Sequence, residues 1–336
     1  WHWGRVRAQV KNLAEVPEAA GLGLMACTHL LNLSWRYEVS ADEIKAMLEE
    51  GRAFARAVGD VAAEVKVAIV YNRACCSAGD LSTYVDIALE NLEAARKTDD
   101  VALQANATGF LADAFLYTGR LPEALAVAET GMAEFANDLP RSEWLQGFNP
   151  WSVLHFWRST CLALTGRLAE GLASYEEGRA IVEADGSPEA AAYLWSWAAL
   201  AYLTAGDIAK VIECAAEVDK VCTALGDPLT IVAHRLLCQT YVALGAGRPQ
   251  EAADTARAAL AIHKVGERQH AGMSAMLLAQ ALLFSGDPAG AVAAAEESVE
   301  MCRAMLRTNL EAQAQGVLAF AVLARDCANA KAMSEA

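Results

Sequence analysis

A turn of the form Gly-Asp or Gly-Arg recurs along the chain and constrains its fold more than any other feature. The turn glycines are Gly79, Gly119, Gly166, Gly206, Gly247 and Gly286, with spacings of 40, 47, 40, 41 and 39 residues. Each turn follows an apolar segment of helical length and precedes a second segment rich in Ala and Glu. A fixed period of this kind predicts a solenoid, in which each helical hairpin packs against its neighbours.

The residues around each turn agree with this interpretation. Glycine accepts the left-handed conformation that ends a helix, and Asp caps the start of the helix that follows. Pro122, Pro249 and Pro288 come directly after three of the turns, where a missing N–H is harmless. A weaker, earlier copy places helices at 26–35 and 42–58. The sequence therefore predicts about seven hairpins.

Short Asp-containing segments, three of which also contain Gly, separate one hairpin from the next, at 58–60, 98–100, 184–186 and 225–228. No linker rich in Pro or Ser divides the chain, so we expect a single helical-repeat domain over 1–336. Within it we expect an N-terminal partial helix at 1–19, about seven hairpins over 20–306 and a C-terminal capping helix at 307–336. An insertion at 135–157, dense in aromatic residues, accounts for the one long spacing.

The charge balance and the cysteines exclude other classes of protein. The chain has 42 acidic and 27 basic residues, a net charge of −15, and no basic run that could replace phosphate counterions, so we expect no nucleic-acid binding. Nine cysteines without C-x-x-C spacing indicate reduced core thiols and a cytoplasmic protein. Two uncharged stretches, 190–206 and 271–286, fall at equivalent repeat positions, so we interpret them as buried helices rather than membrane spans.

Small residues around the turn glycines carry a resemblance to a known repeat. They are Ala112, Ala124 and Ala128 around Gly119, with Phe115 at an aromatic position, and Ala279, Ala291 and Ala295 around Gly286. This arrangement resembles the tetratricopeptide repeat (TPR). The resemblance implies an all-α, right-handed superhelical solenoid of about seven TPR-like hairpins with a period near 40 residues.

Three further segments resemble those of a narrower group of helical-repeat proteins. The sequences LEEGRAFARAVGD, SEWLQGFNPW and LGDP, with the long period, look like the C-terminal repeat region of large bacterial signal-transduction ATPases, often behind a class III adenylate/guanylate cyclase domain. ATP-dependent transcriptional regulators of the MalT type carry a similar array. The resemblance implies a sensor or regulatory region of a longer protein whose activity it modulates.

Motifs for catalysis or metal binding are missing from the sequence pattern. It contains no G-x-x-x-x-G-K-[ST] loop and no H-E-x-x-H motif, and its six histidines are scattered. We interpret the adjacent Cys75 and Cys76 as two buried thiols rather than a redox pair. We therefore predict a non-enzymatic segment with no catalytic residue, cofactor or metal site.

Binding is the class of function that these observations leave open. The first helix of each hairpin is expected to line a concave groove. The predicted groove positions are Lys66, Arg73, Asn106, Asp113, Phe156, Tyr193, Arg235, Gln239 and Gln280. Arg73 and Asp113 fit a structural pair or hydrated side chains in an open groove. Together with Arg235, they also fit recognition of an acidic or polar ligand or partner segment. Trp144 and Phe148 in the insertion are predicted to form an apolar contact surface for a protein partner or an upstream domain.

These features lead to one functional hypothesis with two alternatives. The chain is predicted to be a protein-interaction and sensor domain of a bacterial signalling ATPase of the nucleotide cyclase type. The alternatives are a stand-alone scaffold that binds proteins or peptides in its groove, and the ligand-sensing domain of an ATP-dependent transcriptional regulator.

Overall fold

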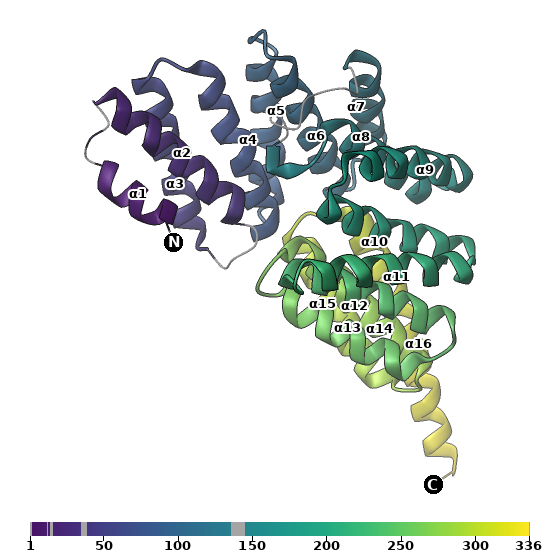
Figure 1. Ribbon diagram of the computed structural model, residues 1–336. Coiled ribbons are helices and arrows are strands. Elements are labelled where there is room, and N and C mark those ends of the chain that lie inside the picture. Colours follow the sequence, from purple (N-terminus) through teal and green to yellow (C-terminus); the bar gives the residue numbers. More distant parts are fainter. Residues whose placement is uncertain (1, 12, 14–15, 35–38, 136–144, 336) are drawn as a thin grey trace. The chain divides into compact units, whose positions relative to one another are not determined.

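The computed structural model describes residues 2–11, 13, 16–34, 39–135 and 145–335, and these are helical with short connections (Figure 1). The helices of the N-terminal half are α1 (His2–Val10), α2 (Pro17–Ser34), α3 (Ala41–Ala57), α4 (Val61–Ala78), α5 (Leu81–Ala95), α6 (Val101–Tyr117), α7 (Leu121–Glu134), η2 (Leu145–Gly147) and α8 (Pro150–Leu164). Those that follow are α9 (Leu168–Asp185), α10 (Pro188–Ala205), α11 (Ile208–Ala224), α12 (Leu229–Gly245), α13 (Pro249–His263), η3 (Arg268–His270), α14 (Ala271–Phe284), α15 (Pro288–Ala304) and α16 (Thr308–Glu335).

Among the described residues, the order of these elements confirms the all-α class and gives seven successive helix pairs, in agreement with the predicted number of about seven hairpins. Hairpins run from α2–α3 to α14–α15, with α1 before them and α16 after them. The final helix begins at Thr308, at the predicted start of the cap, and continues for 28 residues.

Contacts between Cα atoms divide the chain into two compact units. The first unit comprises Trp1–Leu116 and Arg120–Cys161, and the second comprises Tyr117–Gly119 and Leu162–Ala336. The expectation of one continuous domain stays a prediction.

The predicted turn glycines all adopt the left-handed conformation. Their φ angles lie between 68° at Gly247 and 84° at Gly166 and Gly286. At Gly79 and Gly206 the glycine N–H and the residue after it bond back to the last carbonyls of the first helix. A residue with a Cβ would be strained at such angles, so the recurring glycine is what lets the chain reverse in so few residues.

The second helix of a hairpin starts in one of two ways, and the residue after the glycine decides which. At Asp80, Asp207 and Asp287 the carboxylate accepts a hydrogen bond from the N–H three residues later, which caps the helix. Arginine takes the same place at three other turns and instead pairs with a glutamate three residues later. These pairs are Arg120–Glu123, Arg167–Glu170 and Arg248–Glu251.

Alanines at the helix crossings let successive hairpins approach closely. The six alanines predicted for these positions, Ala112, Ala124, Ala128, Ala279, Ala291 and Ala295, have no exposed surface. The first and second helices of a hairpin are called first-type and second-type helices. In the second unit each first-type helix also contacts the next one, in the order α10, α12, α14, and α14 contacts the final helix α16. Side chains at one register position of successive repeats are therefore neighbours in space.

The uncharged helices and all but one of the cysteines are placed as expected. Eight of the nine cysteines are buried free thiols, and Cys327 is exposed. Burial raises the pKa of Cys161 to about 12, which keeps this thiol protonated and unreactive. Among the described residues, no helix combines the length and the apolarity needed to cross a bilayer.

The two kinds of turn predict different sensitivities to mutation. We expect Asp207→Ala to lower the free energy of unfolding by about 1 kcal/mol, because an N–H of α11 loses its cap. Arg248→Ala should lower it by about 0.2–1 kcal/mol, because it removes only an exposed ion pair. Urea unfolding followed by far-UV circular dichroism measures both changes. Asp207→Asn is the control, since Asn also caps helices, and a loss equal to that of Asp207→Ala would contradict the assignment.

Candidate functional site

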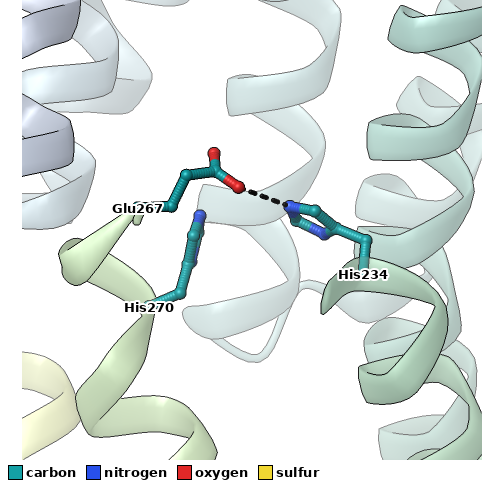
Figure 2. Close-up of side chains that lie close together, drawn as sticks. All are labelled: His234, Glu267 and His270. Atoms are coloured by element: carbon teal, nitrogen blue, oxygen red, sulfur yellow. Dashed lines mark ion pairs between the residues drawn. The ribbon is translucent and has the colours of Figure 1, made fainter. Parts of the chain in front are cut away.

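A cluster of titratable side chains lies inside the second unit. Figure 2 shows His234 of α12, Glu267 and His270 pointing toward one another. Glu267 lies between α13 and α14, and His270 is the residue before α14. All three side chains are about 1% exposed. Carboxylates and imidazoles are seldom buried this fully unless they are paired or bind a ligand.

The repeat register places His234 beside Tyr193. Tyr193, His234 and Met273 each lie 13 residues before the turn glycine of their hairpin, Gly206, Gly247 and Gly286 respectively. Because α10 and α12 are in contact, the rings of Tyr193 and His234 meet edge to face with centroids 4.4 Å apart. The predicted groove residue Tyr193 is thus part of this cluster.

An unusual backbone conformation places Glu267. Its φ angle is 53°, in the left-handed region that residues with a side chain rarely adopt. Asp227, at the equivalent junction one repeat earlier, has a φ of 55°, and its carboxylate pairs with Arg235 at 2.9 Å. Asp227 is exposed whereas Glu267 is buried. The same turn geometry therefore serves a surface ion pair in one repeat and the buried cluster in the next.

Hydrogen bonds hold the three side chains in place. The Ser196 hydroxyl lies 2.9 Å from Nδ1 of His234, and the Tyr193 hydroxyl donates to Oε1 of Glu267 at 3.0 Å. The second carboxylate oxygen, Oε2, is 3.7 Å from Nε2 of His234. Within the same unit, the Tyr117 hydroxyl lies 3.4 Å from Nε2 of His270.

A third histidine, His263, lies next to these residues at the end of α13. It has no exposed surface, and its ring centroid is 5.4 Å from that of His270 and 6.3 Å from that of His234. Its Nδ1 is 2.8 Å from the Ser274 hydroxyl. Burial lowers the pKa of His263 to about 3, so the ring is a neutral imidazole near pH 7.

Chemically, the cluster offers ligand atoms for a metal ion. One atom from each of His234, Glu267 and His270 can be chosen so that all three lie within 4.8 Å of one another. Sequence spacing did not reveal the site, because His234 lies in a different repeat from the other two. The one indication of the site in the sequence is the segment from His263 to His270, which places two histidines and Glu267 within eight residues.

The predicted groove positions of the first unit are mostly buried. Arg73, Asn106, Asp113 and Phe156 are buried, and Lys66 is half-buried. Asn106 has a structural role, because its side-chain amide donates a hydrogen bond to the carbonyl of Ala102 and its Oδ1 accepts one from the N–H of Leu145. Of the second-unit positions outside the cluster, Gln239 is exposed and Arg235 and Gln280 are half-buried.

Asp113 is part of a buried polar contact in the first unit. Its Oδ2 accepts a hydrogen bond of 2.6 Å from the hydroxyl of Tyr84, a side chain with no exposed surface. Burial, reinforced by the Asp113 charge, raises the pKa of Tyr84 well above its usual value, whereas the Arg73 charge opposes this shift. This arrangement favours the structural interpretation of Arg73 and Asp113 over an open, hydrated one.

The inserted segment is described only in part. Trp144 lies outside the described residues, and Phe148 is half-buried. Phe156 and Trp157 are buried against each other, with ring centroids 4.4 Å apart and an interplanar angle of 83°. The contact surface predicted for Trp144 and Phe148 stays a prediction.

Comparison with known proteins supports the fold. No protein family and no curated protein matches the sequence. Aspartyl phosphate phosphatase F from Bacillus subtilis is similar in structure, with a TM-score of 0.60 and 10% identity, over 87% of this chain and 72% of that one. A signal transduction ATPase with numerous domains and a tetratricopeptide repeat sensor, from Pyrococcus horikoshii, gives a TM-score of 0.46 and 12% identity, over 85% of this chain and 44% of that one. The chain has a TPR-like helical-repeat fold.

The contact between Tyr84 and Asp113 predicts a measurable loss of stability. We expect Tyr84→Phe to lower the free energy of unfolding by about 1.5–3 kcal/mol, because a buried carboxylate loses a hydrogen bond. Tyr241→Phe is a matched control, since that hydroxyl is also buried but reaches only the Met273 sulfur, at 3.9 Å. Urea unfolding measures both variants, and losses of equal size would contradict the importance of the carboxylate contact.

Proposed function

We propose that the chain is a non-catalytic protein-interaction and regulatory domain. The observation that carries this proposal is the run of seven hairpins whose first-type helices, in the second unit, stack side by side. Such stacking repeats one set of surface positions along an array, which suits an extended partner better than a single small substrate. The repeat architecture therefore supports binding rather than turnover.

The proposal extends to a parent protein. On the resemblance of the LEEGRAFARAVGD, SEWLQGFNPW and LGDP segments, we assign the domain to a bacterial signalling ATPase of the class III nucleotide cyclase type, whose activity it modulates. A stand-alone scaffold and the ligand-sensing domain of an ATP-dependent transcriptional regulator are the alternatives. Partner binding measured with and without an upstream nucleotide-binding module separates the stand-alone scaffold from the two ATP-dependent roles.

Phosphatase activity is the competing function to test. The similar protein from Bacillus subtilis is named an aspartyl phosphate phosphatase, but at 10% identity the likeness extends to the fold alone. We expect neither acyl phosphate nor ATP to be hydrolysed faster in the presence of this chain than in buffer. Hydrolysis that follows the folded protein through purification would contradict the non-catalytic proposal.

The accessible polar positions on first-type helices indicate where a partner would bind. Arg235 and Gln239 lie one turn apart on α12, and Arg235 is held by Asp227 and by Asp219, whose carboxylate is 3.6 Å away. Exposed ion pairs contribute little to stability, so a carboxylate of a partner can replace either one at small cost. This supports recognition of an acidic peptide segment.

An array of acidic, neutral and basic peptides tests this surface. We expect Arg235→Ala to weaken binding of acidic peptides about 10-fold or more, because a charge-assisted hydrogen bond is lost. Arg257→Ala is the matched control, since Arg257 is an exposed arginine paired with Asp254 on the second-type helix α13. Equal affinities for the wild type and Arg235→Ala, or equal losses in both variants, would contradict the proposed surface.

A further inference from the structure

The buried cluster of the second unit needs a physical explanation that partner binding does not provide. Glu267, His234, His270 and His263 are each exposed by 1% or less. Transferring a carboxylate and several imidazoles from water into a helical core is unfavourable unless strong interactions replace their hydration. At the register position of His234, other repeats carry unrelated side chains, such as Asn106, Val153 and Met273, so the repeat itself does not require a histidine there.

The separations within the cluster are those of ligands around one ion. Oε2 of Glu267 and Nε2 of His234 are 3.7 Å apart, which is too long for a hydrogen bond. Two ligand atoms that each lie about 2.1 Å from a tetrahedral ion are about 3.4 Å from each other. One atom of His270 joins them within 4.8 Å, so small side-chain rotations bring all three to that spacing.

The surrounding hydrogen bonds resemble those that orient metal ligands. The Ser196 hydroxyl contacts Nδ1 of His234, which leaves Nε2 facing Glu267. Tyr193 donates to Oε1 of Glu267, so Oε2 remains directed toward the histidine. In metal sites an outer hydrogen bond of this kind fixes the ring or carboxylate that binds the ion.

We propose that the second unit binds one divalent transition-metal ion of the zinc class through His234, Glu267 and His270. Imidazole and carboxylate donors suit Zn²⁺ and its neighbours in the first transition row, whereas Mg²⁺ and Ca²⁺ prefer oxygen donors alone. His263 is the nearest further nitrogen donor, and among the described residues its Nε2 has no hydrogen-bond partner. A shift of this ring toward the cluster completes a four-coordinate, closed site of the structural kind.

The site links two repeats of the array. His234 belongs to α12, and His270 is the residue before α14, so the ion joins neighbouring first-type helices through the Glu267 junction. Its binding is independent of the proposed interaction function, because none of the three ligands belongs to the peptide-binding surface assigned to Arg235 and Gln239.

Titration of the metal-free full chain tests the proposal. After treatment with a chelator, the wild type is titrated with Co²⁺ and then with Zn²⁺. We expect one Co²⁺ per chain, the intense visible absorption of four-coordinate Co²⁺, and loss of that absorption as Zn²⁺ displaces it. A wild type that takes up neither ion at stoichiometric concentration overturns the proposal and makes the cluster a metal-free hydrogen-bonded network.

Variants locate the ion. Glu267→Gln and His270→Gln should each weaken Zn²⁺ binding at least 100-fold, and Ser196→Ala, which removes an orienting hydrogen bond, about 10- to 100-fold. Glu176→Gln is the matched control, because the Tyr202 hydroxyl donates to Glu176 at 3.0 Å outside the cluster. Zn²⁺ affinity that is unchanged in both Glu267→Gln and His270→Gln places the ion elsewhere and overturns the proposal.

Thermal unfolding of the wild type keeps the test valid if a variant fails to fold. A free Zn²⁺ concentration 100 times its Kd should raise the Tm of the full chain above that of the metal-free protein by about 4 °C. Mg²⁺ at the same concentration should leave the Tm unchanged. A Tm that does not respond to Zn²⁺ overturns the proposal, while peptide binding that is lost with Zn²⁺ binding intact contradicts only the proposed function.

Discussion

The left-handed turn that ends each first-type helix is the constraint on which the rest of the structure depends. Gly206, Gly247 and Gly286 reverse the chain within a few residues, so the two helices of each hairpin pack closely against each other. Because these turns recur about every 40 residues, each position before a turn has a counterpart in the next repeat. The solenoid then places such counterparts side by side.

This register also explains how the buried cluster arises. Tyr193 and His234 are counterparts, and their rings are in contact because α10 lies against α12. A second repeated feature, the left-handed residue at the junction between hairpins, adds Glu267. In the preceding repeat the equivalent junction residue is Asp227, which is exposed. The same backbone conformation therefore places one carboxylate at the surface and the other in the core. The cluster thus depends on two periodic features of the backbone and on a few side chains that depart from the repeat.

The proposed metal site and the proposed binding surface use different parts of the same helix. His234 and Arg235 are adjacent on α12, but His234 is buried whereas Arg235 reaches the ion pairs with Asp219 and Asp227. An ion held by His234 would restrict the movement of α12 relative to α14. A partner bound at Arg235 would then meet a more rigid helix, which lowers the entropic cost of binding.

The sequence by itself determined the repeat, the turn glycines, the proline positions and the buried alanines, because each follows from local backbone conformation or from helix contact at a fixed spacing. Inspection of the sequence also identified Tyr193, Arg235 and Asp113, but not their surroundings. Only the tertiary structure decided that Asp113 meets Tyr84, and that His234 meets Glu267 from another repeat. The repeat spacing indicates which positions are neighbours, but the burial and bonding of their side chains depend on how distant segments pack together.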